Sequence, residues 1–149
     1  MPHIRGGGLY IVTPLEAQAR LVERLIGHWT QGYGSGVNPE RKEALTGVKV
    51  VDTIEDMLDN FGLGIEEAAV MVTSAREGPD TISYAQGRKV LERASRSALL
   101  FGTAHGLAQS AMDLATVRLA PIPGVREYNH LPVRSAVSII MDRLLGQGG

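Results

Sequence analysis

Short runs of apolar and β-branched residues recur along the chain, and a helix-starting signal follows most of them. The runs cover residues 9–13, 48–51, 68–73, 98–102 and 117–120. Runs of this length and composition are typical of strands. Strands that alternate with helices indicate a mainly parallel sheet. We therefore predict an α/β fold with a mainly parallel sheet flanked by helices.

The helix-starting signals are capping residues and prolines. Thr13 and Glu16 form a capping-box pattern, and Ser83 with Gln86 forms another. The glycine-rich segment 32–36 is expected to be a loop. Helices are expected at residues 15–29, 39–45, 53–62, 83–94 and 132–145.

The run at 68–73 has no polar residue before its end. Continuous apolar strands are typical of parallel sheets that helices cover on both faces. This run is therefore expected to be the central strand. In such sheets ligands bind beyond the carboxyl ends of the strands.

Composition limits the class of protein. The 149 residues, 44% hydrophobic and 21% charged, suit one globular domain. No segment approaches the roughly 20 consecutive apolar residues of a membrane helix. Zero cysteines exclude disulfides and thiolate zinc sites, and they fit a cytoplasmic protein. Residues 1–8 contain no apolar signal core and are interpreted as a flexible leader, with a single domain over 9–149.

The net charge of −1 means that any affinity for nucleic acid must come from local patches. Acidic residues gather in 52–67 and basic residues in 88–96. The plainer interpretation of both segments is a pair of solvated helix faces.

Several common site motifs are absent. The chain has no GxGxxG after a strand, no GxxxxGK[ST] and no GxSxG. The histidines show no paired ligand spacing, so no metal site is expected.

Two segments suggest a ligand site. Residues 99–107 are a strand followed by a loop bounded by Gly102 and Gly106, and residues 119–136 are a strand end, a long turn and a helix entry. Glycine permits close approach of the backbone to a ligand. Either segment alone fits ordinary turn chemistry, but their positions at consecutive strand ends suggest one site.

These segments resemble motifs of the SPOUT class of RNA methyltransferases. The resemblance extends over nearly the whole chain from about Leu9, and it is closest to a small bacterial subfamily. It rests on Tyr10-Ile11-Val12-Thr13, Gly32-Tyr33-Gly34-Ser35 with Asn38-Pro39, Thr73-Ser74-Ala75, Gly102 to Leu107, and Asn129-His130-Leu131-x-Val133-Arg134-x-Ala136. It implies a deep C-terminal trefoil knot in about residues 98–146 that binds S-adenosylmethionine.

The resemblance also implies site residues. Strand-end loops would supply backbone groups and an apolar wall for the cofactor. The cofactor residues are then Thr73, Gly102, Thr103, Gly106, Ile122, Asn129 and Leu131. Asn129, His130 and Arg134 are candidates for orienting the reacting groups, with a surface salt bridge as the alternative for Arg134.

RNA, either tRNA or rRNA, is the implied substrate. RNA contacts would fall on Arg20, Arg24, His28, Arg41 and Lys42, with Trp29 and Tyr33 interleaved as rings on which unpaired bases can stack. The alternative is that Trp29 and Tyr33 are buried packing residues, and for Trp29 we favour it, because it lies on the apolar stripe of its helix. SPOUT enzymes are typically homodimers through the last helix, and apolar residues on more than one side of 133–145 agree with this.

Two departures from the class are visible. Relatives usually carry a further strand and helix before the position of Leu9, and Leu131 stands where many place an Asn two residues after a Ser. A non-catalytic cofactor- or RNA-binding module is therefore an alternative function. A third alternative is an unrelated doubly wound α/β protein without a knot.

Overall fold

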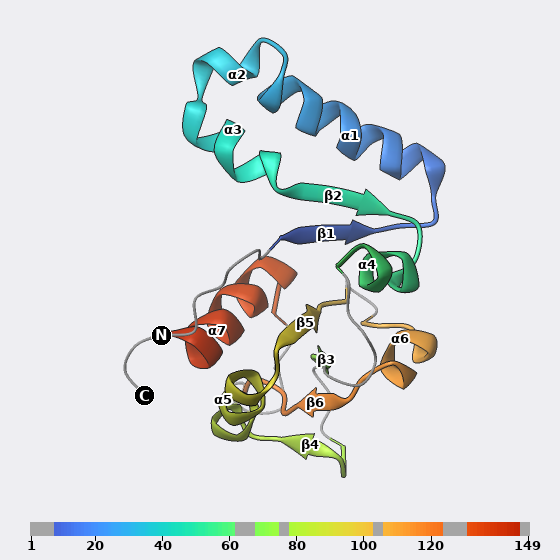
Figure 1. Ribbon diagram of the computed structural model, residues 1–149, viewed down its shortest axis with the longest axis vertical. Coiled ribbons are helices and arrows are strands. Elements are labelled where there is room, and N and C mark those ends of the chain that lie inside the picture. The colour runs from blue at the N-terminus through green and yellow to red at the C-terminus, as the bar shows by residue number, and fades with distance from the viewer. Residues whose placement is uncertain (1–7, 62–67, 75–77, 103–105, 124–130, 147–149) are drawn as a thin grey trace. The chain divides into compact units, whose positions relative to one another are not determined.

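The computed structural model describes residues 8–61, 68–74, 78–102, 106–123 and 131–146 (Figure 1). Contacts within the chain divide it into two compact units, essentially His3–Gly62 and Leu63–Gly149. Apart from Gly8, the leader expected at residues 1–8 lies outside the described residues.

The first unit is a pair of parallel strands with helices between and after them. Leu9 pairs with Val48, and the register continues to Val12 opposite Val51. Both strands were predicted. The elements are β1 (Leu9–Val12), α1 (Glu16–Thr30), α2 (Gly34–Val37), α3 (Pro39–Thr46), β2 (Val48–Val51) and α4 (Ile54–Phe61).

Polar side chains start the helices α3 and α4. The side chain of Asn38 accepts a hydrogen bond from the N–H of Arg41 at 3.0 Å, at the start of α3. Thr53 accepts one from the N–H of Asp56 at 3.1 Å. Such bonds satisfy N–H groups that have no partner inside the helix. The predicted starts of α3 and α4 are confirmed.

The capping box predicted at Thr13 is wrong. The N-cap of α1 is Leu15, and it makes no side-chain capping bond. The N–H of Thr13 donates to the carbonyl of Val51 at 3.0 Å, so Thr13 still belongs to the strand ladder. Its hydroxyl instead accepts from the N–H of Leu15 and donates to Gln18. This buried threonine therefore links the end of β1 to the start of α1.

The second unit contains a four-stranded parallel sheet in the order β4-β6-β3-β5. The run at 68–73 forms β3, between β5 and β6, and its predicted central position is confirmed. The elements are β3 (Ala68–Val72), β4 (Thr81–Ile82), α5 (Tyr84–Arg93), β5 (Arg96–Leu100), α6 (Gln109–Asp113), β6 (Val117–Leu119) and α7 (Val133–Leu145).

The core of the second unit lies between the sheet and α7. Met71 of β3 and Leu119 of β6 are almost fully buried, and Ile140 and Leu144 of α7 pack with them. Ile140 and Leu144 are four residues apart, so both lie on the face of the helix that packs on the core. Gly87 of α5 approaches Leu119 and Leu144 closely.

In the part of the chain that the structure describes, no helix is long and apolar enough to span a membrane.

Candidate functional site

The carboxyl ends of β3 and β5 bring two predicted site residues to one edge of the sheet. Val72 pairs with Leu100, so Thr73 and Gly102 follow neighbouring strand ends. The hydroxyl and the N–H of Thr73 both donate to the carbonyl of Leu100, at 3.1 and 3.3 Å. These bonds join the two strand ends just before the loop that begins at Gly102.

The backbone at Gly102 and Gly106 comes into very close approach. A Cβ on Gly102 would lie 2.8 Å from the Cα of Gly106 and 2.6 Å from the N of Leu107. Real side chains do not occupy such positions, so only glycine fits at Gly102. Gly106 has φ +77°, a conformation that favours glycine. The chain thus returns onto the end of β5, while Thr103 lies outside the described residues.

The end of β6 is held by two hydrogen bonds, one to β4 and one to the start of α5. The N–H of Ala120 donates to the carbonyl of Ile82 at 2.9 Å, and the Tyr84 hydroxyl donates to the carbonyl of Ala120 at 2.9 Å. Ile122 follows and packs, half-buried, against the core of the second unit. Because β6 is parallel to β3, its carboxyl end lies at the same edge as Thr73.

The last predicted segment is described only in part. Asn129 and His130 lie outside the described residues. Leu131 is 43% exposed, and Arg134 is exposed in the first turn of α7. Within the described ranges Arg134 makes no ion pair, so the salt bridge considered for it is not observed there.

The predicted RNA residues all lie in the first unit. Arg20 pairs with Glu16 one turn earlier on α1. Arg24, Arg41 and Lys42 are exposed, and the guanidinium of Arg41 lies over the Trp29 ring, 4.4 Å from its centroid. Trp29 is half-buried, in line with the packing role that we favoured for it.

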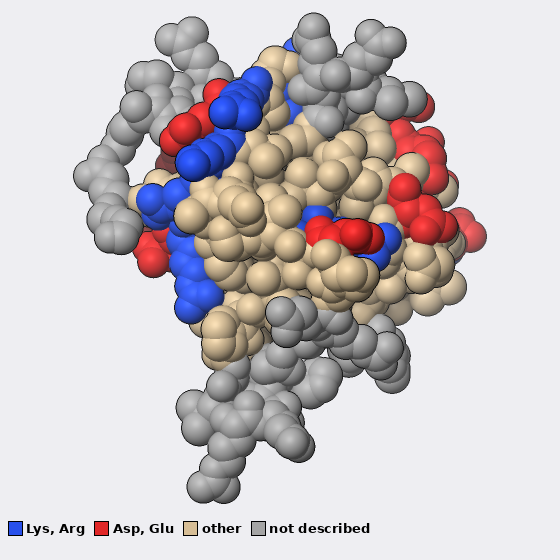
Figure 2. Space-filling view, turned by 90° about the horizontal axis from the view of Figure 1, so that it is seen from below, with Lys and Arg blue, Asp and Glu red and all other residues tan. Residues whose placement is uncertain are grey.

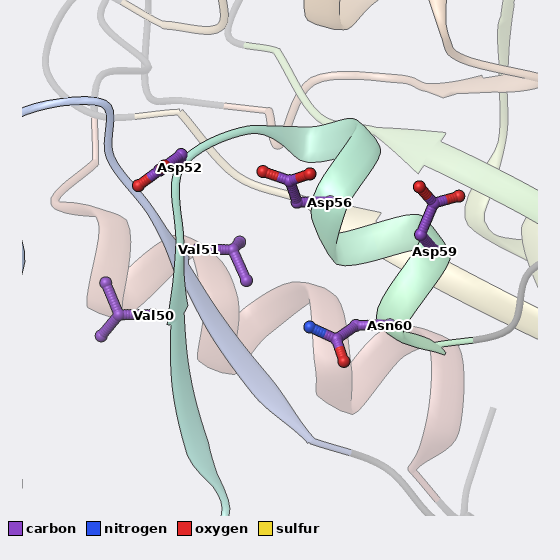
Figure 3. A pocket seen from close by; sticks show the side chains of 6 residues that line it. All are labelled: Val50, Val51, Asp52, Asp56, Asp59 and Asn60. Atoms are coloured by element: carbon purple, nitrogen blue, oxygen red, sulfur yellow. The ribbon is translucent and has the colours of Figure 1, made fainter.

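A hollow in the first unit is acidic and lies among none of the predicted site residues. It has a volume of about 560 Å³, and Val50, Val51, Asp52, Asp56, Asp59 and Asn60 line it. Figure 3 shows Asp56, Asp59 and Asn60 along α4, with Asp52 just beyond β2. Carboxylates repel phosphate, so this hollow does not suit an RNA backbone. Across the described ranges no cluster of side chains could hold a metal ion.

Sequence reasoning missed the contacts that join α5 to α7. Arg88 donates from Nε to the carbonyl of Arg143 and from Nη2 to the carbonyl of Gly146, the latter at 3.2 Å. Arg143 in turn lies over the Tyr84 ring, 5.1 Å from its centroid. Burial raises the pKa of the Tyr84 hydroxyl, and the Arg143 charge opposes this shift. The capping box at Ser83 was the local signal that placed Tyr84 at the start of a helix.

Basic side chains are visible together on one face of the protein. Figure 2 shows Lys and Arg gathered along the left of the view. Arg88, Lys89 and Arg93 belong to α5. The segment 88–96 therefore forms a solvated helix and the strand start that follows it, with Arg88 turned to α7.

Similar proteins give the family context. The chain is 42% identical to a tRNA (guanine-N(1)-)-methyltransferase of Nitratidesulfovibrio vulgaris over 141 residues, which are 94% of this chain and 33% of that protein. A protein of the same name from Oleidesulfovibrio alaskensis is 43% identical over 141 residues, again 94% of this chain and 33% of that protein. The chain thus spans about a third of the length of these two relatives. An uncharacterised protein of Aquifex aeolicus is 34% identical, over 93% of this chain and 68% of that one.

Solved structures show the same fold at low sequence identity. A probable methylase family protein from Haemophilus influenzae gives a TM-score of 0.60 at 19% identity, covering 94% of this chain and 66% of that one. TrmJ from Z. mobilis gives a TM-score of 0.61 at 16% identity, and the match covers 95% of this chain and 69% of that one. A probable methyltransferase from Bordetella pertussis gives a TM-score of 0.59 at 18% identity, and the match covers 91% of this chain and 90% of that one. The family model described as "SAM-dependent RNA methyltransferase" matches residues 6–146, and the chain belongs to this family, as its resemblance to the SPOUT class implied.

Proposed function

We propose that this chain transfers the methyl group of S-adenosylmethionine to a nucleotide of structured RNA, either tRNA or rRNA. The observation that carries the proposal is the close approach of Gly102 to Gly106 beside Thr73. It places glycine backbone at a strand end, where ligands bind in parallel α/β sheets.

The residues at this edge fit the cofactor. A Cβ on Gly106 would meet no atom within 4 Å, so there is open space beside its backbone. Backbone N–H and C=O groups can read the edge of adenine, and Ile122 offers an apolar wall. We assign cofactor binding to Thr73, Gly102, Thr103, Gly106, Ile122, Asn129 and Leu131.

The chemistry demands little of the protein beyond alignment. Bound S-adenosylmethionine supplies an electrophilic methyl group on a sulfonium. Holding an RNA nucleophile in line with that methyl group supplies much of the catalysis. We assign this positioning to Asn129, His130 and Arg134. Arg134 is exposed at the start of α7, where its charge is available to an RNA phosphate.

The relatives suggest which RNA to test first. Two of them are named tRNA (guanine-N(1)-)-methyltransferase, and this chain corresponds to about a third of each. A guanine of tRNA is therefore the first acceptor to examine, with rRNA as the second substrate.

The same proposal includes a knot, a dimer and a cytoplasmic location. The knot would lie in about residues 98–146, with a second copy covering α7. Val133, Val137 and Met141 repeat every four residues along α7 and are exposed or half-buried. Such a stripe favours an isologous helix contact.

A transfer assay tests the activity. The protein is incubated with methyl-labelled S-adenosylmethionine and unmodified transcripts of tRNA and rRNA. We expect label in an RNA and a loss of at least tenfold in Arg134→Ala. Ser138→Ala, one turn further along α7, is the matched control and should transfer like the wild type. A folded protein that labels neither class of RNA would contradict the proposal and favour a binding module without catalysis.

A further inference from the structure

The end of the first unit formed by α1, α2 and α3 holds an arginine over an aromatic ring. The Arg41 guanidinium of α3 lies 4.4 Å from the centroid of the Trp29 ring of α1. His28 meets the same ring edge-on, with centroids 5.0 Å apart and planes at 87°. The guanidinium thus contacts Trp29 on one side. Because Arg41 is an exposed residue, the side turned away from the ring is accessible from solvent.

A glycine lets the neighbouring segment close over these rings. A Cβ on Gly34 would lie 2.7 Å from Cε3 of Trp29 and 3.0 Å from the ring of His28. Gly34 is buried, and both its neighbours in space are aromatic. This packing restricts the Trp29 ring and, through it, the position of Arg41.

The residue before this glycine is a tyrosine that points to solvent. Tyr33 is 84% exposed, the highest value among the large hydrophobic side chains exposed in the described residues. Its backbone is tied on both sides: the N–H of Gly32 donates to Gly27, and the N–H of Gly36 donates to Tyr33. Because the backbone is already held, a ligand that covers this exposed ring has to order the side chain only and not a loop.

The charges here are nearly balanced. On α3, Arg41 and Lys42 stand beside Glu40 and Glu43. Attraction of phosphate to this helix is therefore weak, and stacking has to supply most of any affinity for RNA. Unpaired bases stack both on aromatic rings and on Arg guanidinium planes.

We propose that unpaired nucleotides of the RNA substrate stack on the Tyr33 ring and on the outer face of the Arg41 guanidinium. This inference rests on the proposed function, and it names single-stranded loop RNA as the substrate class. Trp29 is the support beneath Arg41, and it contacts no base itself.

The chain provides its own probe. Trp29 is its single tryptophan, so its fluorescence reports on this end of the first unit. An eight-nucleotide single-stranded RNA of mixed sequence is titrated into the full chain without S-adenosylmethionine, and the duplex of the same sequence is titrated separately. We expect the single strand to shift the Trp29 emission and to bind at least tenfold more tightly than the duplex.

Three substitutions separate stacking from charge. Tyr33→Ala and Arg41→Ala should each weaken binding by about fivefold or more, the low end for the loss of one stacked base. Arg41→Lys keeps the charge but loses the planar face, so it should weaken binding nearly as much. Gln31→Ala, an exposed polar change beside Tyr33, is the matched control and should bind like the wild type. Unfolding curves for each variant verify that the fold is kept.

The outcomes distinguish this inference from the proposed function. Equal binding of single strand and duplex, or wild-type affinity in Tyr33→Ala and Arg41→Lys, would overturn the inference even if the wild type methylates RNA. Selective binding that depends on Tyr33 and Arg41 supports it, and this result would stand even if no RNA were methylated. A lack of methylation beside such binding would refute the transferase activity alone.

Discussion

A Cβ on Gly102 would lie 2.8 Å from the Cα of Gly106, so the backbone that follows β5 folds back directly onto the end of that strand. Thr73, at the end of the neighbouring strand, donates two hydrogen bonds to the carbonyl of Leu100 just before this loop. The pair of glycines and the threonine together shape the candidate cofactor site. No larger residue fits at Gly102 without moving the loop.

Gly34 and Gly27 should respond in opposite ways to alanine. A Cβ at Gly34 would meet the Trp29 ring at 2.7 Å, so Gly34→Ala should lower the free energy of unfolding by about 1 kcal/mol or more and shift the Trp29 emission. Gly27 lies inside α1, where a Cβ would meet nothing within 4 Å. Gly27→Ala should therefore raise the free energy of unfolding by up to about 1 kcal/mol. Urea unfolding measures both changes, and a stabilised Gly34→Ala protein would refute the close packing.

Tyr84 should make stability depend on alkaline pH. Burial raises the pKa of its hydroxyl above the ordinary value of 10.0, with Arg143 opposing the shift. A raised pKa means that the folded state favours the neutral hydroxyl. Its contribution is therefore complete below pH 10 and is lost as the pH rises through the folded pKa.

Tyr84→Phe isolates this contribution. The variant loses the hydrogen bond to the carbonyl of Ala120 and should be less stable by about 1 kcal/mol at neutral pH. The difference between the two proteins should shrink above pH 10, which urea unfolding from neutral to alkaline pH would show. A difference that stays constant over this range would contradict the account.

Arg88 should protect the last turn of α7. It donates to the carbonyls of Arg143 and Gly146, and lysine cannot reproduce this two-pronged geometry. Arg88→Lys should lower the local stability of that turn by about 1 to 2 kcal/mol. Hydrogen exchange at the amides of Asp142 to Leu145 measures this loss. The matched control is Arg93→Lys on the exposed side of α5, and equal exchange in both variants would exclude the role given to Arg88.

The sequence predicted the longer elements well because their signals are local. Runs of β-branched residues marked β1, β2 and β3, and the capping residues Asn38 and Ser83 marked the starts of α3 and α5. The short elements carry no such signal. The strand β4 has two residues, and α6 starts after Ala108 without a capping side chain. The helix α2 is glycine-rich and was expected to be a loop, yet the packing of Gly34 on Trp29 holds it in place.

The candidate site was predictable where it depends on parallel strand ends. Such ends meet at one edge, which was the ground for joining segments 99–107 and 119–136 in one site. Thr73 was added through the family resemblance, and the register of β3 with β5 brings it beside Gly102. The hydrogen bonds by which Tyr84 holds the end of β6 and Arg88 holds the end of α7 were not predictable. Tyr84 bonds a carbonyl 36 residues away, and Arg88 bonds carbonyls more than 50 residues away, and no local pattern marks such pairs.

The central claim is that the loop between Gly102 and Gly106 binds S-adenosylmethionine, and calorimetric titration of the full chain tests it most directly. The wild type should bind the cofactor and its demethylated product. Gly102→Ala should bind at least tenfold more weakly, because its Cβ would displace the backbone of Gly106 and Leu107. Gly47→Ala, where a Cβ meets nothing within 4 Å, is the matched control and should bind like the wild type. A folded wild type that binds neither molecule, or a Gly102→Ala protein that binds as tightly as the wild type, would contradict the claim.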